Sequence, residues 1–222
     1  MFHVEHFGEI VSACLADHVH LIGLTLTQTQ LDQFATFADQ LSCWNEKINL
    51  TAITESKDVA IKHFFDSLYG VNALRTPRTR RMVDVGSGGG FPGIPLKIVL
   101  PELPLTMVEP SGKKVAFLLH MAGLLKLSQV HVLNRQIEHI SRQDRGMDGP
   151  ISFVVRGLKI EGRLRHLSSL LNSGDRLIVY GTDPWLPHFV DPHLVLVDEI
   201  PYQLPLDLGK RRLIVLERNA RP

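Results

Sequence analysis

Residues 82–99, MVDVGSGGGFPGIPLKIV, decide the fold class of this chain. An apolar strand delivers Asp84, a turn containing Gly86, Gly88 and Gly90 follows, and a helix begins near Ile94. Glycine is needed where the backbone takes a positive φ or comes within contact distance of a ligand. A strand, a glycine turn and a helix in this order indicate an α/β unit that holds a ligand at the carboxyl end of its strand.

The residues after this turn continue the same alternation of short β-branched runs and helices. The expected strands are Met82–Val85, Leu105–Glu109, Val130–Leu133, Ile151–Val155, Leu177–Tyr180, Leu194–Ile200 and Leu213–Glu217. The expected helices between them are Ile94–Leu100, Lys113–Leu125 and Arg163–Leu171. Strands joined by single helices predict a doubly wound, mainly parallel sheet of seven strands. Only a short connection with Pro and Gly separates the last two strands, so we expect an antiparallel hairpin at the end.

The residues before the turn have a helical pattern instead. Leu31, Phe34, Ala38 and Leu41 form one apolar stripe of a helix, and the T-x-x-Q spacing of Thr27 and Gln30 predicts a capping box at its start. A second helix is expected over Val59–Leu74, and the segment TPRTRR (76–81) reads as a linker. We therefore expect an N-terminal helical segment, residues 1–75, and a ligand-binding domain, residues 76–222.

Composition excludes several classes of protein. Among 222 residues, 24 Lys and Arg balance 23 Asp and Glu, so a polybasic binder is excluded although local basic patches are not. The start of the chain has no signal-peptide pattern, and no apolar run approaches the roughly 18 residues of a membrane span. The two cysteines and the scattered histidines form no set of metal ligands. We expect a cytoplasmic, monomeric protein with no metal and no membrane contact.

The glycine turn itself allows two cofactor classes. Gly88, Gly90 and Gly93 match the G-x-G-x-x-G spacing of a dinucleotide site, but Pro92 and Pro95 remove N–H groups that a diphosphate would need. In the second interpretation, D-x-G-x-G-x-G approaches an adenosyl ligand without phosphate. Asp84 would then supply negative charge near a sulfonium amino acid, and Glu109, at the end of the next strand, would accept the ribose hydroxyls. We favour this interpretation, which is S-adenosylmethionine.

Four segments also resemble one protein family in their sequence and order. They are WNEKINLTAI (44–53), HFFDSL (63–68), VDVGSGGGFPGIPLKI (83–98) and GKKVAFL (112–118). The chain is similar over about residues 27–160 to the bacterial glucose-inhibited division protein B family, which methylates guanine N7 in small-subunit (16S) ribosomal RNA. The resemblance implies a class I methyltransferase fold with an N-terminal helical extension, S-adenosylmethionine as cofactor, and 16S rRNA or the small subunit as substrate.

The family pattern assigns further residues to the cofactor and shows two departures. The resemblance places Gly86 and Phe91 in the cofactor loop, Ile137 and Glu138 beside the adenine, and Arg156 at the end of the fourth expected strand. Gly157 stands here where the family's S/T-R-A motif has alanine, and Tyr180 stands where members usually have lysine. The segment DPWLPHFVDP (183–192) matches no pattern.

The expected chemistry assigns no catalytic residue. Guanine N7 carries an in-plane lone pair and loses no proton, so it needs only alignment with the methyl donor; Arg156 is a candidate for binding the methionine carboxylate or an RNA phosphate. Candidate RNA contacts are Arg75, Arg78, Arg80, Arg81, Lys113, Lys114, Arg211 and Arg212. The alternative hypothesis is a non-catalytic or divergent module that binds adenosylmethionine or a nucleotide.

Overall fold

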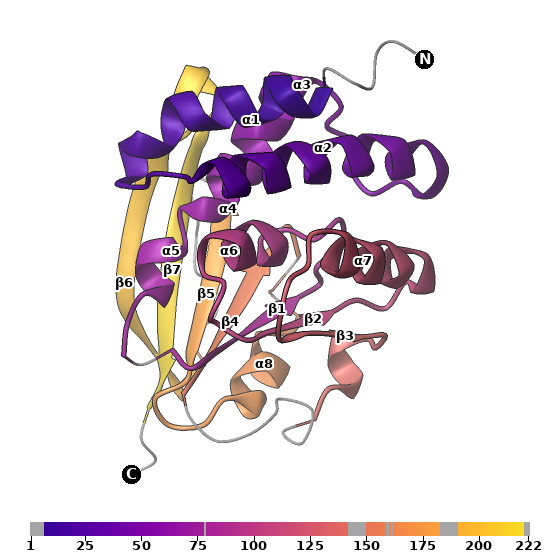
Figure 1. Ribbon diagram of the computed structural model, residues 1–222. Helices are drawn as coiled ribbons and strands as arrows, with labels where there is room; N and C mark the ends of the chain where they lie inside the picture. Colours follow the sequence, from indigo (N-terminus) through magenta and orange to yellow (C-terminus); the bar gives the residue numbers. More distant parts are fainter. Residues whose placement is uncertain are drawn as a thin grey trace.

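The structure is a computed structural model that describes residues 7–77, 79–141, 150–158, 160, 162–182 and 191–219. Figure 1 shows its arrangement. The helical elements are α1 (Phe7–His18), η1 (Val19–Ile22), α2 (Gln28–Ile48), α3 (Ser56–Asp58), η2 (Val59–Phe65), α4 (Asp66–Leu68), α5 (Val71–Leu74), α6 (Gly93–Val99), α7 (Gly112–Leu124), η3 (Ile137–His139), α8 (Leu164–Leu170) and η5 (Pro205–Asp207). The strands are β1 (Arg81–Val85), β2 (Leu105–Val108), β3 (Val130–Leu133), β4 (Ile151–Arg156), β5 (Arg176–Thr182), β6 (Leu194–Gln203) and β7 (Lys210–Arg218).

The seven strands form one sheet in the order β3-β2-β1-β4-β5-β7-β6. β1 to β5 pair in parallel, whereas β7 is antiparallel to both β5 and β6. The doubly wound, mainly parallel sheet and the terminal hairpin are thus confirmed. The last two strands, β6 and β7, are longer than expected. Their antiparallel pairing continues toward the connecting turn as far as Gln203 and Lys210. The chain order reverses between β1 and β4, and the carboxyl ends of these strands therefore flank a crevice.

Helices cover the two faces of the sheet unequally. On one face, α4 to α7 lie against the strands and α1 to α3 form a further layer above them, whereas α8 lies on the opposite face (Figure 1). The larger core cluster joins α2 residues such as Phe34 and Phe37 to Met82 of β1 and Phe117 of α7. The smaller cluster packs Phe153 of β4 against Leu167 of α8. The expected N-terminal segment and the sheet therefore share one hydrophobic core.

The start of α2 confirms the capping box that the T-x-x-Q spacing predicts. Thr27 Oγ1 accepts a hydrogen bond from Gln30 N at 3.3 Å, and Gln30 Oε1 accepts one from Thr27 N at 2.9 Å, which completes the capping box. Phe34, Phe37, Ala38 and Leu41 are the buried residues of this helix. Its apolar stripe packs against α6 and α7.

The expected helix over Val59–Leu74 is not continuous, and that prediction was wrong. The range is divided into the π-helix η2, which follows α3 directly, then α4, and after a turn at Tyr69 and Gly70, α5. A π-helix widens the turn and redirects backbone carbonyl groups, a distortion that is frequent at functional sites. The expected linker is also part of the sheet, because Arg81 begins β1 and Thr79 Oγ1 lies 2.8 Å from Ser152 Oγ of β4.

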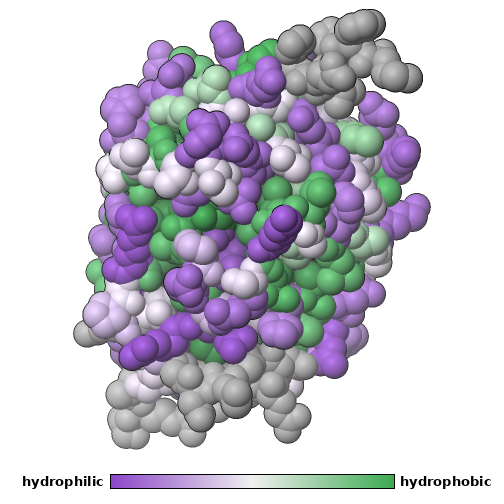
Figure 2. Space-filling view, in the orientation of Figure 1, coloured by the Kyte–Doolittle hydropathy of each residue, from purple (hydrophilic) through white to green (hydrophobic). Residues whose placement is uncertain are grey.

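Figure 2 shows the surface in the same orientation. Polar side chains cover most of this face, and apolar ones show chiefly in its middle, interrupted by polar ones. No helix in the described part of the chain has both the length and the apolar character of a membrane span.

Candidate active site

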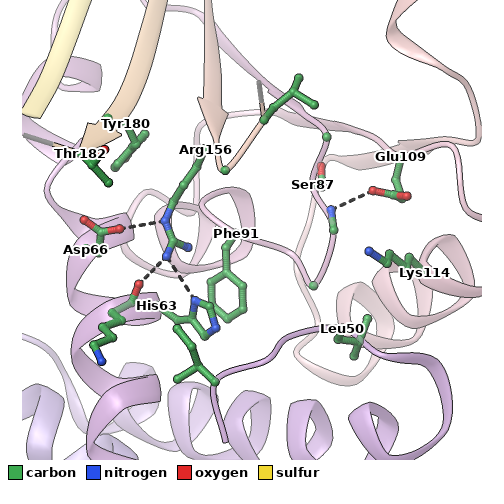
Figure 3. Close-up of a pocket in the computed structure, with 18 of the residues that line it drawn as sticks. Leu50, His63, Asp66, Ser87, Phe91, Glu109, Lys114, Arg156, Tyr180 and Thr182 are labelled. Atoms are coloured by element: carbon green, nitrogen blue, oxygen red, sulfur yellow. Dashed lines mark hydrogen bonds and ion pairs between the residues drawn. The ribbon is translucent and has the colours of Figure 1, made fainter. Parts of the chain in front are cut away.

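A cavity of about 530 Å³ lies at the carboxyl ends of β1, β2, β4 and β5 (Figure 3). The glycine turn and Glu109 line it from the sheet, and Arg156 and Tyr180 line it from the ends of β4 and β5. The helical segment contributes His63 and Asp66 from the opposite side. The crevice predicted at the strand ends is therefore closed by residues from the N-terminal helices.

The glycines of the turn after β1 have different functions. Gly86 has φ +74° and Gly88 has φ +54°, and both line the cavity. Gly90, with φ +92°, does not line it; a Cβ there would lie 2.6 Å from Ile94 Cδ1, within the core. The structure therefore places Gly90 in the packing of the loop on α6 and not in the cavity wall, and its expected cofactor contact stays a prediction.

Asp84 is also placed differently from the expectation. Its side chain is fully buried behind the loop, does not line the cavity, and accepts a hydrogen bond from Gly93 N through Oδ2 at 3.1 Å. Among the described residues, Oδ1 has no hydrogen-bond partner. Burial raises the pKa of Asp84 to about 7, so its negative charge is weakened at neutral pH. Asp84 thus supports the start of α6 from behind the loop, and its expected proximity to the cofactor stays a prediction.

Glu109 follows β2 directly and is fixed in the cavity. Its Oε2 accepts a hydrogen bond from Gly88 N and its Oε1 one from Ser111 N, both at 2.9 Å. The residue is only 5% exposed, yet it lines the cavity beside Gly88. Each carboxylate oxygen has a second lone pair, so Glu109 can accept two further hydrogen bonds from a bound diol. The position agrees with the predicted ribose contact.

A second cavity, of about 280 Å³, adjoins the first. Gly86, Pro110 and Leu158 line both cavities, so the two spaces meet at the glycine turn. Ile137 and Glu138 of η3 line the second one, and Glu138 pairs with Arg163 at 2.9 Å. An elongated ligand can therefore extend from Glu109 to η3.

Arg156 connects the sheet to the N-terminal helices. Its Nε donates to Asp66 Oδ2 at 2.8 Å, and its Nη2 donates to the Lys62 carbonyl and lies 3.2 Å from His63 Nδ1. The π-helix η2 brings this carbonyl and this imidazole to the same guanidinium group, which also lies over the Phe91 ring at 5.7 Å. Arg156 is therefore a partly buried cross-link as well as a residue of the cavity wall.

His63 is held as a neutral ring in this cluster. Its ring stacks on Phe91 with 4.5 Å between centroids, and Nε2 lies 2.7 Å from Thr51 Oγ1. Burial and the adjacent Arg156 charge lower the pKa of His63 to about 3. Because Arg156 donates to Nδ1, the proton lies on Nε2, which donates to Thr51. Phe91 lines the cavity, as expected from the resemblance.

The candidate RNA-binding residues are not all at the site. Lys114 of α7 and Arg211 of β7 line the cavity, whereas Lys113 is exposed outside its lining. Arg80 and Arg81 lie at the amino end of β1, about 13 Å of strand away from the end that faces the cavity, so an RNA contact there would lie outside the cavity and stays a prediction. Arg78 lies outside the described residues.

His63 and Asp66 line the cavity and Tyr202 lies behind Asp66, and none of these three residues had a function assigned from the sequence. Tyr202 Oη donates to Asp66 Oδ1 at 2.7 Å. Asp66 is 3% exposed, and the one sequence signal for it was an acid within the apolar run FFDSL, since buried acids need partners. Nothing local indicated Tyr202, which is 136 positions from Asp66.

Two solved structures are similar to this chain in fold. The Agrobacterium tumefaciens structure described as a predicted O-methyltransferase has a TM-score of 0.56 at 17% identity, covering 70% of this chain and 81% of that one. TrmN from Thermus thermophilus has a TM-score of 0.52 at 17% identity, covering 72% of this chain and 53% of that one. At these identities the likeness concerns the fold alone.

Sequence comparisons are more specific. The Ribosomal RNA small subunit methyltransferase G of Staphylococcus carnosus is 32% identical over 209 residues, which cover 89% of this chain and 86% of that protein. The protein of the same name from Roseiflexus castenholzii is 46% identical over 121 residues, and the match spans 54% of this chain and about half (51%) of that relative. Residues 30–180, more than half of the chain, match the family described as rRNA small subunit methyltransferase G. The chain belongs to this family.

Proposed function

We propose that this protein transfers the methyl group of S-adenosylmethionine to N7 of a guanine in 16S ribosomal RNA. The observation that carries the proposal is Glu109, a carboxylate fixed beside the glycine turn in the cavity of a chain from an rRNA methyltransferase family. A class I methyltransferase sheet supplies the frame, and the two joined cavities supply a site long enough for an adenosyl ligand.

The backbone N–H groups of the loop support an adenosyl ligand over a dinucleotide. A diphosphate needs unpaired N–H donors at the glycine turn. Here Gly86 N and Ser87 N donate to Val108 O, Gly88 N donates to Glu109, and Gly90 N and Phe91 N donate to Ser87 O. Because the loop uses these donors internally, it offers a carboxylate to a ribose and has few N–H groups left for phosphates.

The adjoining cavity has the chemistry of an adenine site. Ile137 is 7% exposed and provides an apolar surface, and Glu138 beside it provides a carboxylate that can accept from an amino group. A ribose at Glu109 and an adenine at η3 would place the amino-acid end of the cofactor in the larger cavity, near Arg156. The residues that line the two cavities and the family to which the chain belongs support these positions of the adenine, the ribose and the amino-acid end.

The reaction needs alignment more than proton transfer. When bound, S-adenosylmethionine would supply an electrophilic methyl group; the in-plane lone pair of guanine N7 would take this methyl as its bond to sulfur breaks, with S-adenosylhomocysteine as the leaving group and no proton lost from the guanine. His63 is neutral and its ring nitrogens are occupied by Arg156 and Thr51, which agrees with a reaction that needs no general base. The contribution of the protein is to hold the two reactants at near-attack distance and to exclude water.

Lys114 and Arg211 are the proposed contacts to the RNA backbone. Both line the cavity, and within the described residues neither forms an ion pair with an acidic side chain. Losing one phosphate contact should reduce the salt dependence of RNA binding by about one unit of slope. Lys126, beyond the far end of α7 and about 20 Å along the helix, is the matched control.

The test is methyl transfer from labelled cofactor to naked 16S rRNA and to small subunits from a strain that lacks the gene. We expect N7-methylguanosine in the product with the wild type, reduced RNA affinity for Lys114→Ala and Arg211→Ala, and no change for Lys126→Ala. Tight binding of NADH would contradict the cofactor assignment. A wild type that binds S-adenosylmethionine but methylates none of these substrates would favour the non-catalytic alternative.

A further inference from the structure

Arg156 has part of its hydrogen-bonding capacity left for a ligand. Its Nε donates to Asp66, and its Nη2 is occupied by the Lys62 carbonyl and His63 Nδ1. Within the described part of the chain, Nη1 has no hydrogen-bond partner, and Arg156 lines the larger cavity. Two N–H donors of this arginine are therefore available to an oxygen acceptor in the cavity.

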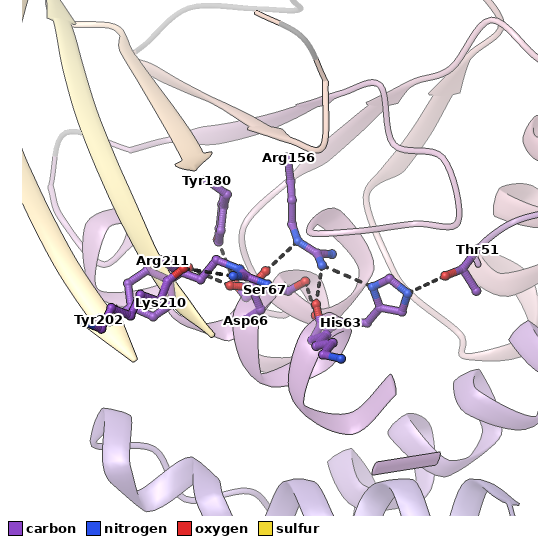
Figure 4. A network of polar contacts seen from close by, with 10 residues as sticks. Thr51, His63, Asp66, Ser67, Arg156, Tyr180, Tyr202, Lys210 and Arg211 are labelled. Carbon is purple, nitrogen blue, oxygen red and sulfur yellow. Dashed lines mark hydrogen bonds and ion pairs between the residues drawn. The ribbon is translucent and has the colours of Figure 1, made fainter. Parts of the chain in front are cut away.

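The direction of these two donors depends on the ion pair of Arg156 with Asp66. The orientation of the Asp66 carboxylate depends in turn on its hydrogen bond from Tyr202. Asp66 uses one oxygen for Arg156 and the other for the Tyr202 hydroxyl, at 2.8 and 2.7 Å (Figure 4). Tyr202 is 6% exposed on β6, and its ring stacks on Tyr69 at 3.6 Å between centroids. The hydroxyl is thus held in place by the packing of its ring. Burial and the Asp66 charge raise the pKa of Tyr202, so it remains a donor across the working pH range.

We propose that Tyr202, at the end of edge strand β6, is a positioning residue that fixes Asp66 and thereby aims Nη1 of Arg156 into the cavity. This inference rests on the proposed function of the site. The acceptor is an oxygen atom, from either the carboxylate of the cofactor or the RNA. Edge strand β6 thereby contributes to the active site through a residue that does not itself line the cavity.

Two physical reasons support this function of the Tyr202 hydroxyl. A carboxylate with a single partner can rotate about its χ2 torsion, whereas one held at both oxygens cannot rotate without breaking a bond. Asp66 also balances the Arg156 charge, which would otherwise repel a sulfonium group and the cationic product of N7 methylation. A fixed, neutral pair can bind an oxygen acceptor without this repulsion.

Tyr202→Phe removes the hydroxyl and keeps the stacked ring, and Tyr69→Phe is the matched control. The Tyr69 hydroxyl has no hydrogen bond among the described residues, so its removal should leave Arg156 unchanged. We expect the order and the hydrogen-exchange protection of the Arg156 Nε–H group, measured by nitrogen-15 NMR, to fall in Tyr202→Phe only. The signal is assigned from its absence in Arg156→Lys.

Activity and binding give the second measurement. We expect kcat/KM to fall about 10- to 100-fold in Tyr202→Phe, the range typical of a small misplacement of a binding group, and to stay within about twofold in Tyr69→Phe. A weaker affinity for S-adenosylmethionine in calorimetry would identify the acceptor as the cofactor carboxylate. An unchanged cofactor affinity with a higher KM for RNA would identify an RNA oxygen.

The proposal is overturned if Tyr202→Phe keeps both the Arg156 NMR signal and the kcat/KM of Tyr69→Phe. Should Tyr202→Phe not fold, the wild type alone still decides, because a disordered and rapidly exchanging Arg156 Nε–H group in it would also overturn the proposal. The NMR measurement needs no substrate. A failure of the proposed methyl transfer would therefore appear as an inactive wild type with an ordered Arg156, which is distinguishable from a failure of this inference.

Discussion

Gly70, in the turn between α4 and α5, should tolerate alanine only when Tyr180 has lost its hydroxyl. A Cβ on Gly70 would lie 2.0 Å from Tyr180 Oη and 3.0 Å from its Cζ. Tyr180 is 8% exposed, and its hydroxyl donates to the Ser67 carbonyl at 2.7 Å, so the ring has little freedom to move. Gly70 has φ −73° and ψ −7°, which alanine adopts readily, and the substitution therefore tests one steric contact.

The expected magnitudes follow from these contacts. Overpacking a core position destabilises a protein by about 1–3 kcal/mol, which we expect for Gly70→Ala. Tyr180→Phe loses one hydrogen bond, about 1 kcal/mol. In the double variant the nearest remaining atom is the ring Cζ at 3.0 Å, which needs a shift of only a few tenths of an ångström. The double variant should therefore lose about 1–2 kcal/mol less free energy of unfolding than the two single variants lose together.

Urea unfolding of the wild type, both single variants and the double variant measures this coupling. Gly123→Ala, in α7 with no atom within 4 Å of the added Cβ, is the control and should raise the free energy of unfolding by up to about 1 kcal/mol. Additive effects, within about 0.5 kcal/mol, would refute the reasoning, because two residues in steric conflict cannot act independently.

Three further predictions concern the site. Glu109→Ala should weaken S-adenosylmethionine binding by about 1.5–3 kcal/mol in calorimetry, and unchanged affinity in a folded variant would contradict the ribose assignment. Gly90→Ala should reduce the free energy of unfolding by about 2 kcal/mol, because its Cβ would lie 2.6 Å from Ile94 Cδ1 at a φ of +92°; a loss of cofactor affinity alone, seen without destabilisation, would restore Gly90 as a ligand contact. His63 has its pKa lowered to about 3, so the unfolded chain binds a proton below about pH 6.5 that the folded chain does not. The free energy of unfolding should accordingly fall as the pH is lowered from 6.5 to 3, and it should fall less steeply in His63→Gln than in the wild type. Equal pH dependence of the two proteins in urea unfolding would disprove this.

Some errors of the sequence interpretation could have been avoided from the sequence itself. Arg80 and Arg81 lie at the amino end of the first strand, and ligands bind at the carboxyl ends of parallel strands, so strand polarity alone places them at the edge opposite the cavity. The direction of the Asp84 side chain could also have been predicted, from the geometry of a strand. Side chains of a strand alternate between the two faces, and an acid within the buried run of β1 points into a core layer.

The sequence by itself determined the features that depend on neighbouring residues. The strand–turn–helix unit at residues 82–99, the capping box of α2 and the order of strands and helices follow from periodicity and from local backbone requirements, and the structure confirms them. Glu109 could be placed beside the glycine turn because adjacent parallel strands end at the same edge of the sheet.

Only the tertiary structure decided which side chains meet around Arg156. Asp66 is 90 positions from Arg156 and 136 from Tyr202, and no local pattern specifies a hydrogen bond between residues on a distorted helix, a central strand and an edge strand. Their meeting depends on how the helical layer packs on the sheet and on the register of the terminal hairpin. Both are set by the burial of a core that all of these elements share, and not by any one segment of the sequence.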